Sequence, residues 1–157
     1  IDLGLILRVF PRAKFILSIR HPNDCVLSCF MQTFNLNDAM ANFLDLKDSA
    51  NLYNLSMRLF EIYKNIFDLN YHLIKYEDLI VSLKDETSKL LKSLNLDWND
   101  EIINYQNTAL SRKINTPSYN QVTEKLYTRA LGRWKNYKSE MEDVLPILEF
   151  WIKKWLY

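Results

Sequence analysis

The chain has 157 residues, of which 48% are hydrophobic and 25% are charged. A chain of this length and composition can bury one core, which predicts a single domain or a large part of one. Its 20 basic and 19 acidic residues leave a net charge of +1, which excludes the strong attraction that nucleic acid or an anionic membrane surface requires. No apolar run reaches the length of a membrane span, so we expect neither a nucleic-acid nor a membrane partner. An anion bound by this chain must be held by local geometry.

The first part of the chain predicts a helix, a strand and a second helix. Residues 3–10 suggest a buried helix that ends before Pro11. The run "KFILSI" at 14–19 is continuously apolar, which is typical of a central parallel strand covered on both faces. Pro22 then opens a helix, because proline is favoured in the first turn. The core-facing stripe that we expect on this helix comprises Val26, Leu27, Phe30, Met31 and Phe34.

The rest of the chain continues this alternation. Residues 48–68 show a helical pattern, and "YHLIKYEDL" at 71–79 predicts a second buried strand that leads into polar residues. The helical stripe comprises Leu52, Leu55, Leu59, Ile62 and Ile66. Further helices are expected over 84–94, 99–107 and about 144–157, and a long polar loop over 108–125. Strands that alternate with helices imply a layered α/β fold with a parallel sheet.

The two cysteines indicate the redox environment. Cys25 and Cys29 lie four residues apart in one helical pattern, where a disulfide is geometrically poor. We therefore expect both thiols to be reduced and to pack as small hydrophobic groups. This predicts a cytoplasmic protein.

Arg20 stands at the carboxyl end of the first strand, directly before the second helix. In parallel α/β sheets, ligands bind outside this end of the strands. A guanidinium group matches phosphate oxygens, and Ser28, on a helix face with Asp24 and Gln32, could donate one more hydrogen bond. The pattern therefore indicates an anion site. From these residues alone an alternative stays open, in which Arg20 pairs with Asp24 or Glu77 and Ser28 faces solvent.

Three segments together resemble one family. "FPRAKFILSIRHPNDCVLSCF" resembles the 3′-phosphate-binding segment of sulfotransferases that use 3′-phosphoadenosine 5′-phosphosulfate (PAPS), with a strand, Arg, Pro-x-Asp and a Ser eight residues after the Arg. "IKYEDLI" is similar to the family's Tyr-Glu-Asp strand. "TPSYNQVTEKLYTRALGRWKNY" resembles the C-terminal signature of a bacterial branch often fused to tetratricopeptide repeats and related to tyrosylprotein sulfotransferases. The resemblance implies the P-loop-NTPase-like sulfotransferase fold, in which helices flank a parallel sheet.

The resemblance also implies roles for four residues. Arg20 and Ser28 would bind the 3′-phosphate of PAPS or of its product, adenosine 3′,5′-bisphosphate (PAP). Tyr76 matches a tyrosine near the adenine, although a strand tyrosine packed in the core has the same pattern. Ser118 matches a serine that lies close to the transferred sulfuryl group and would be both catalytic and cofactor-binding, although a turn hydroxyl would fit there too.

The C-terminal segment carries further candidates. Tyr127, which we take as a cofactor-binding candidate, lies with Arg129, Gly132 and Arg133 in the segment that closes over the nucleotide in relatives. The resemblance does not say which of these residues touches the nucleotide. Trp134, in the same segment, is expected in the core.

Other family features are not found in this sequence. The tyrosylprotein branch has a lysine where this chain has Glu124, and Lys125 follows it, so the role of Lys125 is open. Neither glycine has the Gly-Ser-Thr context of the loop that grips the 5′-phosphosulfate, and His21 and His72 fit structural roles better than that of the general base. We therefore expect residues 1–157 to be one partial domain, the C-terminal portion of a sulfotransferase without its N-terminal strand, phosphosulfate loop and base.

The predicted function is transfer of a sulfuryl group from PAPS to an acceptor hydroxyl on a protein, glycan or small molecule, without a metal. This chain would supply the nucleotide-binding part, with tetratricopeptide repeats upstream as a further partner. One alternative is an inactive remnant that binds nucleotide or uses its aromatic end, "FWIKKWLY", as an interaction surface. Another is a nucleotide kinase, which is disfavoured because the sequence has no Gly-x-x-x-x-Gly-Lys-Ser/Thr loop.

Overall fold

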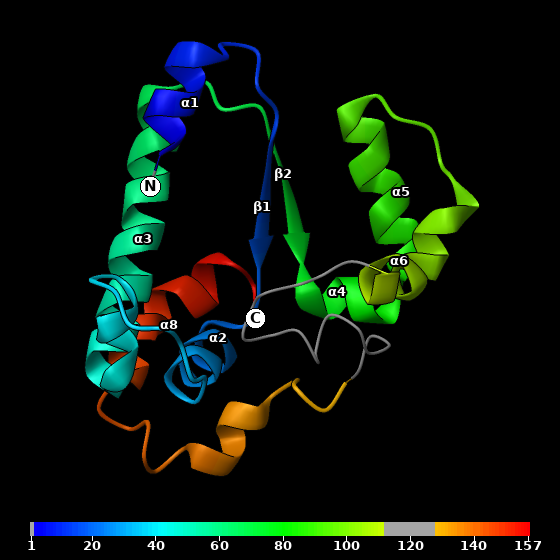
Figure 1. Ribbon diagram of the computed structural model, residues 1–157. Coiled ribbons are helices and arrows are strands. Elements are labelled where there is room, and N and C mark those ends of the chain that lie inside the picture. The colour runs from blue at the N-terminus through cyan, green and yellow to red at the C-terminus, as the bar shows by residue number, and fades with distance from the viewer. Residues whose placement is uncertain (1, 112–127) are drawn as a thin grey trace.

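The structure, a computed structural model, describes residues 2–111 and 128–157. It is a mixed α/β arrangement in which helices flank a two-stranded parallel sheet (Figure 1). The strands are β1 (Phe15–Ile19) and β2 (Tyr71–Lys75). The α-helices are α1 (Leu3–Val9), α2 (Pro22–Phe30), α3 (Leu46–Ile66), α4 (Tyr76–Val81), α5 (Leu83–Leu94), α6 (Tyr105–Ser111) and α8 (Leu145–Lys154). Short 3-10 helices are η1 (Met40–Leu44), η2 (Asp100–Asn104) and η3 (Arg133–Tyr137).

The sheet brings two distant parts of the chain to one end. β1 and β2 pair in parallel, in a register that runs from Phe15 opposite Tyr71 to Ile19 opposite Lys75. Both arrows in Figure 1 point the same way, and α2 and α4 begin just beyond the arrowheads. The predicted parallel pairing is therefore confirmed. The residues that follow the two strands lie side by side, where a parallel sheet presents its ligand site.

Coverage of β1 on both faces was expected and is wrong for the described residues. Its side chains alternate, with Ile19 buried, Phe15 and Leu17 half-buried, and Ile16 49% exposed together with Ser18. The apolar run suggested a two-sided strand, but the described helices cover one face of the pair.

The start of α2 forms as the sequence predicts. Pro22 occupies the first turn, and Nδ1 of His21 accepts a hydrogen bond from the backbone N–H of Asn23 at 3.2 Å. Proline lacks the N–H that would be unpaired at this position, so it suits the helix start. Val26 and Leu27 are buried, as expected.

The far end of the predicted α2 stripe is wrong. The helix ends at Phe30, which is exposed, and so is Met31. Phe34 lies beyond the helix and packs against Phe43, with ring centroids 5.1 Å apart. Only the first two turns of the stripe therefore face the core.

The long helix α3 forms where predicted, but its buried face is not the predicted one. Leu55 is 62% exposed and Ile66 is 67% exposed, and Ile62 is exposed too. The face that packs inward contains Ala50, Tyr53 and Phe60. The chain has two apolar stripes at helical spacing here, and the stripe that includes the small Ala50 and two aromatic rings meets the core.

Helix α1 also differs from its prediction. It ends at Val9, before Pro11 as expected, but none of its residues is fully buried. Leu3 and Leu7 pack against the core, whereas Leu5 and Phe10 are exposed. The helix lies beside one end of α3 (Figure 1), and Gly4 allows this approach because a Cβ there would stand 3.3 Å from the ring of Tyr63.

The core lies where β1, α2, α3 and α8 meet. Trp151 is 1% exposed and Trp155 is also buried, so these two aromatic residues of the C-terminal segment are core residues, as preferred from the sequence. This finding removes the support for an interaction surface made of these tryptophans. The buried cluster comprises Ile19, Val26, Leu27, Ala50, Tyr53, Phe60, Leu69, Met141, Val144, Leu148, Trp151 and Trp155.

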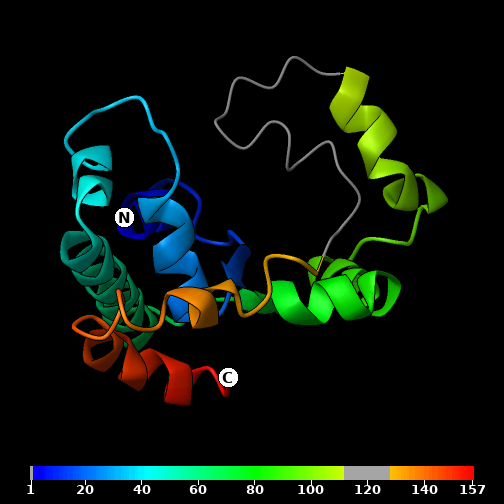
Figure 2. The ribbon, with the colours of Figure 1, turned by 90° about the horizontal axis from the view of Figure 1, so that it is seen from below.

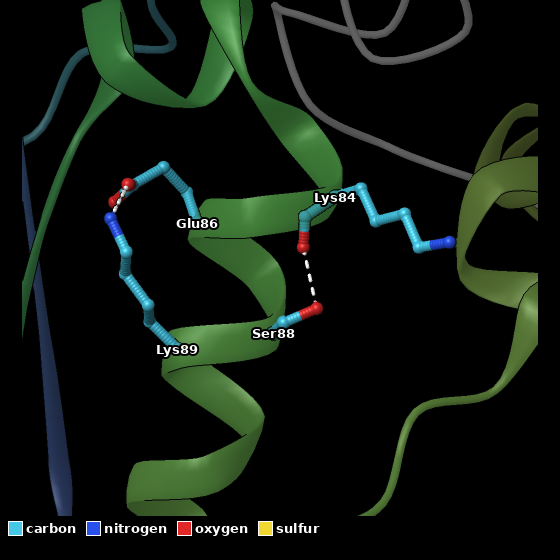
Figure 3. A network of polar contacts seen from close by, with 4 residues as sticks. All are labelled: Lys84, Glu86, Ser88 and Lys89. Carbon is cyan, nitrogen blue, oxygen red and sulfur yellow. Dashed lines mark hydrogen bonds and ion pairs between the residues drawn. The ribbon is translucent and has the colours of Figure 1, made fainter.

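Helix α5 lies on the side of the strands away from α3 (Figures 1 and 2). Figure 3 shows two of its local polar contacts: Ser88 Oγ donates to the carbonyl of Lys84 at 2.7 Å, and Lys89 Nζ lies 2.5 Å from Oε1 of Glu86. A contact of long sequence separation also reaches this helix, because Lys14 Nζ donates to the carbonyl of Ser93 at 2.6 Å. Such contacts between neighbouring turns support a solvated helix. These local contacts therefore support the helix itself.

Three further predictions can be compared with the described residues. No helix among residues 2–111 and 128–157 is long and apolar enough to cross a membrane. Cys25 and Cys29 are both free thiols, as the four-residue spacing predicts. The predicted loop over 108–125 is partly wrong, because α6 continues to Ser111, and the remainder of that segment lies outside the described residues.

Candidate anion-binding site

A cavity of about 270 Å³ opens at the carboxyl end of β1. One wall comes from the end of β1 and from α2, and the other comes from the segment that leads into η3, drawn in orange beside α2 in Figure 2. The volume is just below the roughly 300–1,000 Å³ of pockets that hold drug-sized ligands, so it suits a compact polar group. The lining residues are Arg20, Asp24, Leu27, Ser28, Met31, Arg129, Ala130 and Arg133.

The guanidinium group of Arg20 is held from two sides. Its Nη2 donates to the carbonyl oxygen of Ala130 at 2.5 Å, and its Cζ lies 5.5 Å from the centre of the Tyr76 ring. Its Nε is buried and has no hydrogen-bond partner among the described residues. The ion pairs between described residues are formed by lysines and glutamates of α3, α5 and α8, and none of them involves Arg20. A positive charge fixed in this way is suited to receive an anion.

The carboxylates proposed as alternative partners of Arg20 have other partners. Asp24 accepts hydrogen bonds from the backbone N–H groups of Gly132 and Trp134. Glu77 accepts from the backbone N–H of His21 at 2.9 Å and from the hydroxyl of Tyr157. The structure therefore does not contain the Arg20 ion pairs that the alternative interpretation requires.

Arg20 and Ser28 line the same cavity, so the structure brings these two sequence candidates together. The strand end and the second turn of α2 converge because the helix begins only two residues after Arg20. Tyr76, the first residue of α4, is half-buried and lies next to Arg20 through the parallel pairing of β1 and β2. Ser118 and Tyr127, together with Lys125, lie outside the described residues.

Arg129 and Arg133 are the cavity residues whose part the sequence left open. Both are exposed and line the wall opposite Ser28. With Arg20 they place three guanidinium groups around one opening, while the carboxylate of Asp24 already accepts two amide hydrogen bonds. The sequence signal that could have singled them out is their four-residue spacing around Gly132.

The two histidines take the structural roles expected for them. His21 caps α2, stacks on Trp134 with ring centroids 5.5 Å apart, and lies 5.1 Å from the ring of Tyr157. Burial lowers the pKa of His21, although Asp24 and Glu77 oppose this shift. His72 lies within β2. Trp134 packs against the core, as predicted.

Comparison with known proteins shows the family of the chain. Residues 2–100 match the model of the sulfotransferase family, which is more than half of the chain, and the chain therefore belongs to this family. The family in general uses PAPS and an acceptor substrate. The matched region includes Arg20, Ser28 and Tyr76.

A relative covers nearly the entire chain. An "Uncharacterized protein" of Aquifex aeolicus (strain VF5) is 28% identical over 152 residues, which is 96% of this chain and 20% of that protein. The chain thus spans about a fifth of the length of this relative.

Proposed function

We propose that this chain supplies the nucleotide-binding part of a sulfotransferase that moves a sulfuryl group from PAPS to an acceptor hydroxyl. The observation that carries the proposal is the cavity at the end of β1, where Arg20 and Ser28 face Arg129 and Arg133. When bound, PAPS supplies the sulfuryl group and the nucleotide that leaves with its 3′,5′-bisphosphate. The side chains in hand would bind and orient this nucleotide.

The chemistry of the lining fits a phosphate group. Arg20 lines the cavity, and its guanidinium group can donate charge-assisted hydrogen bonds to phosphate oxygens. Ser28 can donate from the same wall as Arg20, because its hydroxyl rotates freely about Cβ–Oγ. Three guanidinium groups would offset the two negative charges of a 3′-phosphate without help from the nearly neutral net charge of the chain.

Tyr76 has two parts in the proposal. Its ring lies under the guanidinium group of Arg20, which restricts the orientations of that side chain. By the family resemblance, the same ring lies near the adenine. A fixed nucleotide fixes the position of the sulfuryl group, so these residues contribute orientation to the reaction.

The remaining parts of the proposal come from the resemblance. Ser118 would lie close to the transferred sulfuryl group, and Tyr127 would contact the nucleotide. The branch would be the bacterial one associated with tetratricopeptide repeats and related to tyrosylprotein sulfotransferases, with a protein, glycan or small molecule as acceptor. The P-loop-NTPase-like fold, a partial domain over 1–157 and a cytoplasmic location belong to the same proposal. The phosphosulfate grip and the general base are assigned to no residue of this chain.

Isothermal titration calorimetry with PAP and with adenosine 5′-phosphate, which lacks the 3′-phosphate, tests the proposal. We expect the Arg20→Ala variant to lose about 2 kcal/mol or more of PAP binding, as the loss of a charge-assisted hydrogen bond should cost. Its affinity for adenosine 5′-phosphate should be unchanged, because the contact is to the 3′-phosphate. Arg58→Ala is the matched control, since Arg58 is an exposed arginine of α3 that bonds to Asn54.

Three results would contradict the proposal. Equal affinity of the wild-type chain and the Arg20→Ala variant for PAP would show that Arg20 does not bind the 3′-phosphate. A preference of the wild-type chain for ATP over PAP would favour the nucleotide kinase. Binding of PAP without sulfuryl transfer by the full-length protein would favour the alternative of a nucleotide-binding remnant.

A further inference from the structure

A buried carboxylate joins the two walls of the cavity. The side chain of Asp24 is on α2, in the first wall, and Asp24 is only 2% exposed. Its Oδ2 accepts from the backbone N–H of Gly132 at 2.6 Å, and its Oδ1 accepts from the N–H of Trp134 at 2.9 Å. A buried carboxylate is costly unless hydrogen bonds compensate it, and two amides provide that compensation. The contact spans more than a hundred residues of sequence.

The backbone of the second wall is shaped to make this contact. Gly132 has φ +65°, a left-handed conformation that suits glycine, and the N–H of Leu131 donates to the carbonyl of Thr128 at 2.8 Å. Adjacent turns of this kind direct several amide N–H groups to one side, where they form a concave site for a negative charge. Here that charge is the carboxylate of Asp24.

Along the segment 128–134, residues that contact the first wall alternate with residues whose side chains line the cavity. Ala130 accepts from Arg20 through its carbonyl, Gly132 and Trp134 donate to Asp24, and the Trp134 ring stacks on His21. The side chains of the intervening Arg129 and Arg133 line the cavity. The backbone of this segment thus makes the contacts with Arg20 and Asp24, while the side chains of Arg129 and Arg133 lie along the cavity.

From this arrangement we infer that Asp24 is a positioning residue, which holds the segment 128–134 against α2 so that Arg129 and Arg133 face the bound anion. The inference rests on the function proposed for the cavity. Asp24 does not touch the anion itself in this scheme. Its contribution to binding passes through the two arginines, and this dependence can be measured.

The first test needs no nucleotide. Amide hydrogen exchange followed by NMR should show Gly132 and Trp134 protected in the wild-type chain. In Asp24→Asn, one carboxylate oxygen becomes an amide group that cannot accept, so at least one of these two amides should exchange about tenfold faster. The amide of Leu17 in β1 should be unchanged, and Asp38→Asn is the matched control, since Asp38 is exposed. Unchanged exchange at both Gly132 and Trp134 would overturn the inference.

The second test is a double-mutant cycle on PAP affinity. Arg133→Ala should weaken binding in the wild-type background and have a several-fold smaller effect in the Asp24→Asn background, because the arginine is then no longer held in place. Ser28→Ala, on the other wall, should have the same effect in both backgrounds. Additive effects of the Asp24 and Arg133 changes would refute the positioning role.

The two proposals fail in different ways. If the wild-type chain does not bind PAP, the proposed function fails, and the exchange rates of Gly132 and Trp134 still decide whether Asp24 holds the segment. If Asp24→Asn does not fold, Gly132→Ala tests the same contact from the other partner. An alanine at φ +65° is strained, although only the flexible side chain of Lys135 lies near its Cβ, so the exchange and binding changes should match those expected for Asp24→Asn.

Discussion

The carboxylate of Glu77 accepts a hydrogen bond from the hydroxyl of Tyr157, with Oε2 and Oη 2.8 Å apart. Its other oxygen, Oε1, accepts from the backbone N–H of His21 at 2.9 Å. Glu77 therefore ties His21, directly before α2, to the end of the C-terminal segment. Burial, and then the bond to Glu77, raise the pKa of Tyr157, so the hydroxyl stays protonated and donates.

Replacing Tyr157 with phenylalanine removes this donor and keeps the ring next to His21. We expect Tyr157→Phe to lower the free energy of unfolding by about 1–3 kcal/mol, because the half-buried carboxylate loses a hydrogen bond. Urea unfolding measures the change. Tyr137→Phe is the control, since the hydroxyl of Tyr137 makes no hydrogen bond with a described residue. Equal losses in the two variants would mean that the bond to Glu77 contributes nothing.

The stability of the chain should fall as the solution becomes mildly acidic. Burial holds the pKa of His21 below its ordinary value of about 6.5, so the folded chain binds this proton less readily than the unfolded chain. The contribution of neutral His21 is complete above about pH 6.5 and is lost as the pH falls towards the lowered folded-state pKa. Unfolding free energies measured from pH 7.5 to 5 should decrease over this window.

The control for this pH dependence is His21→Asn, because asparagine also caps helices but does not titrate. The variant should lose part of the decrease between pH 6.5 and 5. The same pH profile in the variant and the wild type would assign the decrease to other groups.

Two adjacent aromatic residues of α8 test the position of the core. Trp151 is fully buried and donates from Nε1 to Asn54 at 2.9 Å, whereas Phe150 is 60% exposed. Trp151→Ala should cost about 3–5 kcal/mol of unfolding free energy, because it leaves a large cavity. Phe150→Ala should cost less than about 1 kcal/mol. Comparable losses measured by thermal or urea unfolding would contradict the described packing of α8.

The two thiols of α2 should differ in reactivity. A hydrogen bond from Cys25 to the sulfur of Cys29 raises the pKa of Cys25, which burial raises further, and lowers the pKa of Cys29. Because the thiolate is the reactive form, iodoacetamide should alkylate Cys29 before Cys25. Peptide mass spectrometry at several pH values measures both rates.

The hydrogen bond itself can be tested by changing its donor. Cys25→Ala should slow alkylation of Cys29 near pH 8, and Cys25→Ser, which keeps a donor, should slow it less. If alanine and serine at position 25 have the same effect, the donor does not control the reactivity of Cys29.

Local features of the site could be predicted from the sequence. Arg20 and Ser28 belong to one strand-helix unit, so their separation along the chain fixes how they lie in space, and the cavity contains both. The parallel pairing of β1 and β2 followed from two apolar runs separated by helices. Periodicity could not choose between two apolar stripes on α3, because the choice depends on which other elements pack there, and the stripe with Leu55 proved to be the exposed one.

The role inferred for Asp24 could not be predicted in this way. Its partners are the backbone amides of Gly132 and Trp134, and every residue except proline carries such a group, so no side-chain pattern marks the pair. The one available signal in the sequence was the glycine at position 132. A glycine between two arginines indicates a turn but does not indicate what the turn contacts.

The cavity is built from two parts of the chain that are far apart in sequence, so it can form only late in protein synthesis. Arg20 bonds to Ala130, which comes 110 residues later, and contacts of such high sequence separation form late and slow the folding of a domain. A nascent chain that has emerged from the ribosome only as far as α5 contains β1, α2 and β2 but neither Arg129 nor Arg133. Such a chain has one wall of the cavity, so the anion binding that we propose would begin only after the segment 128–134 has been translated and has docked.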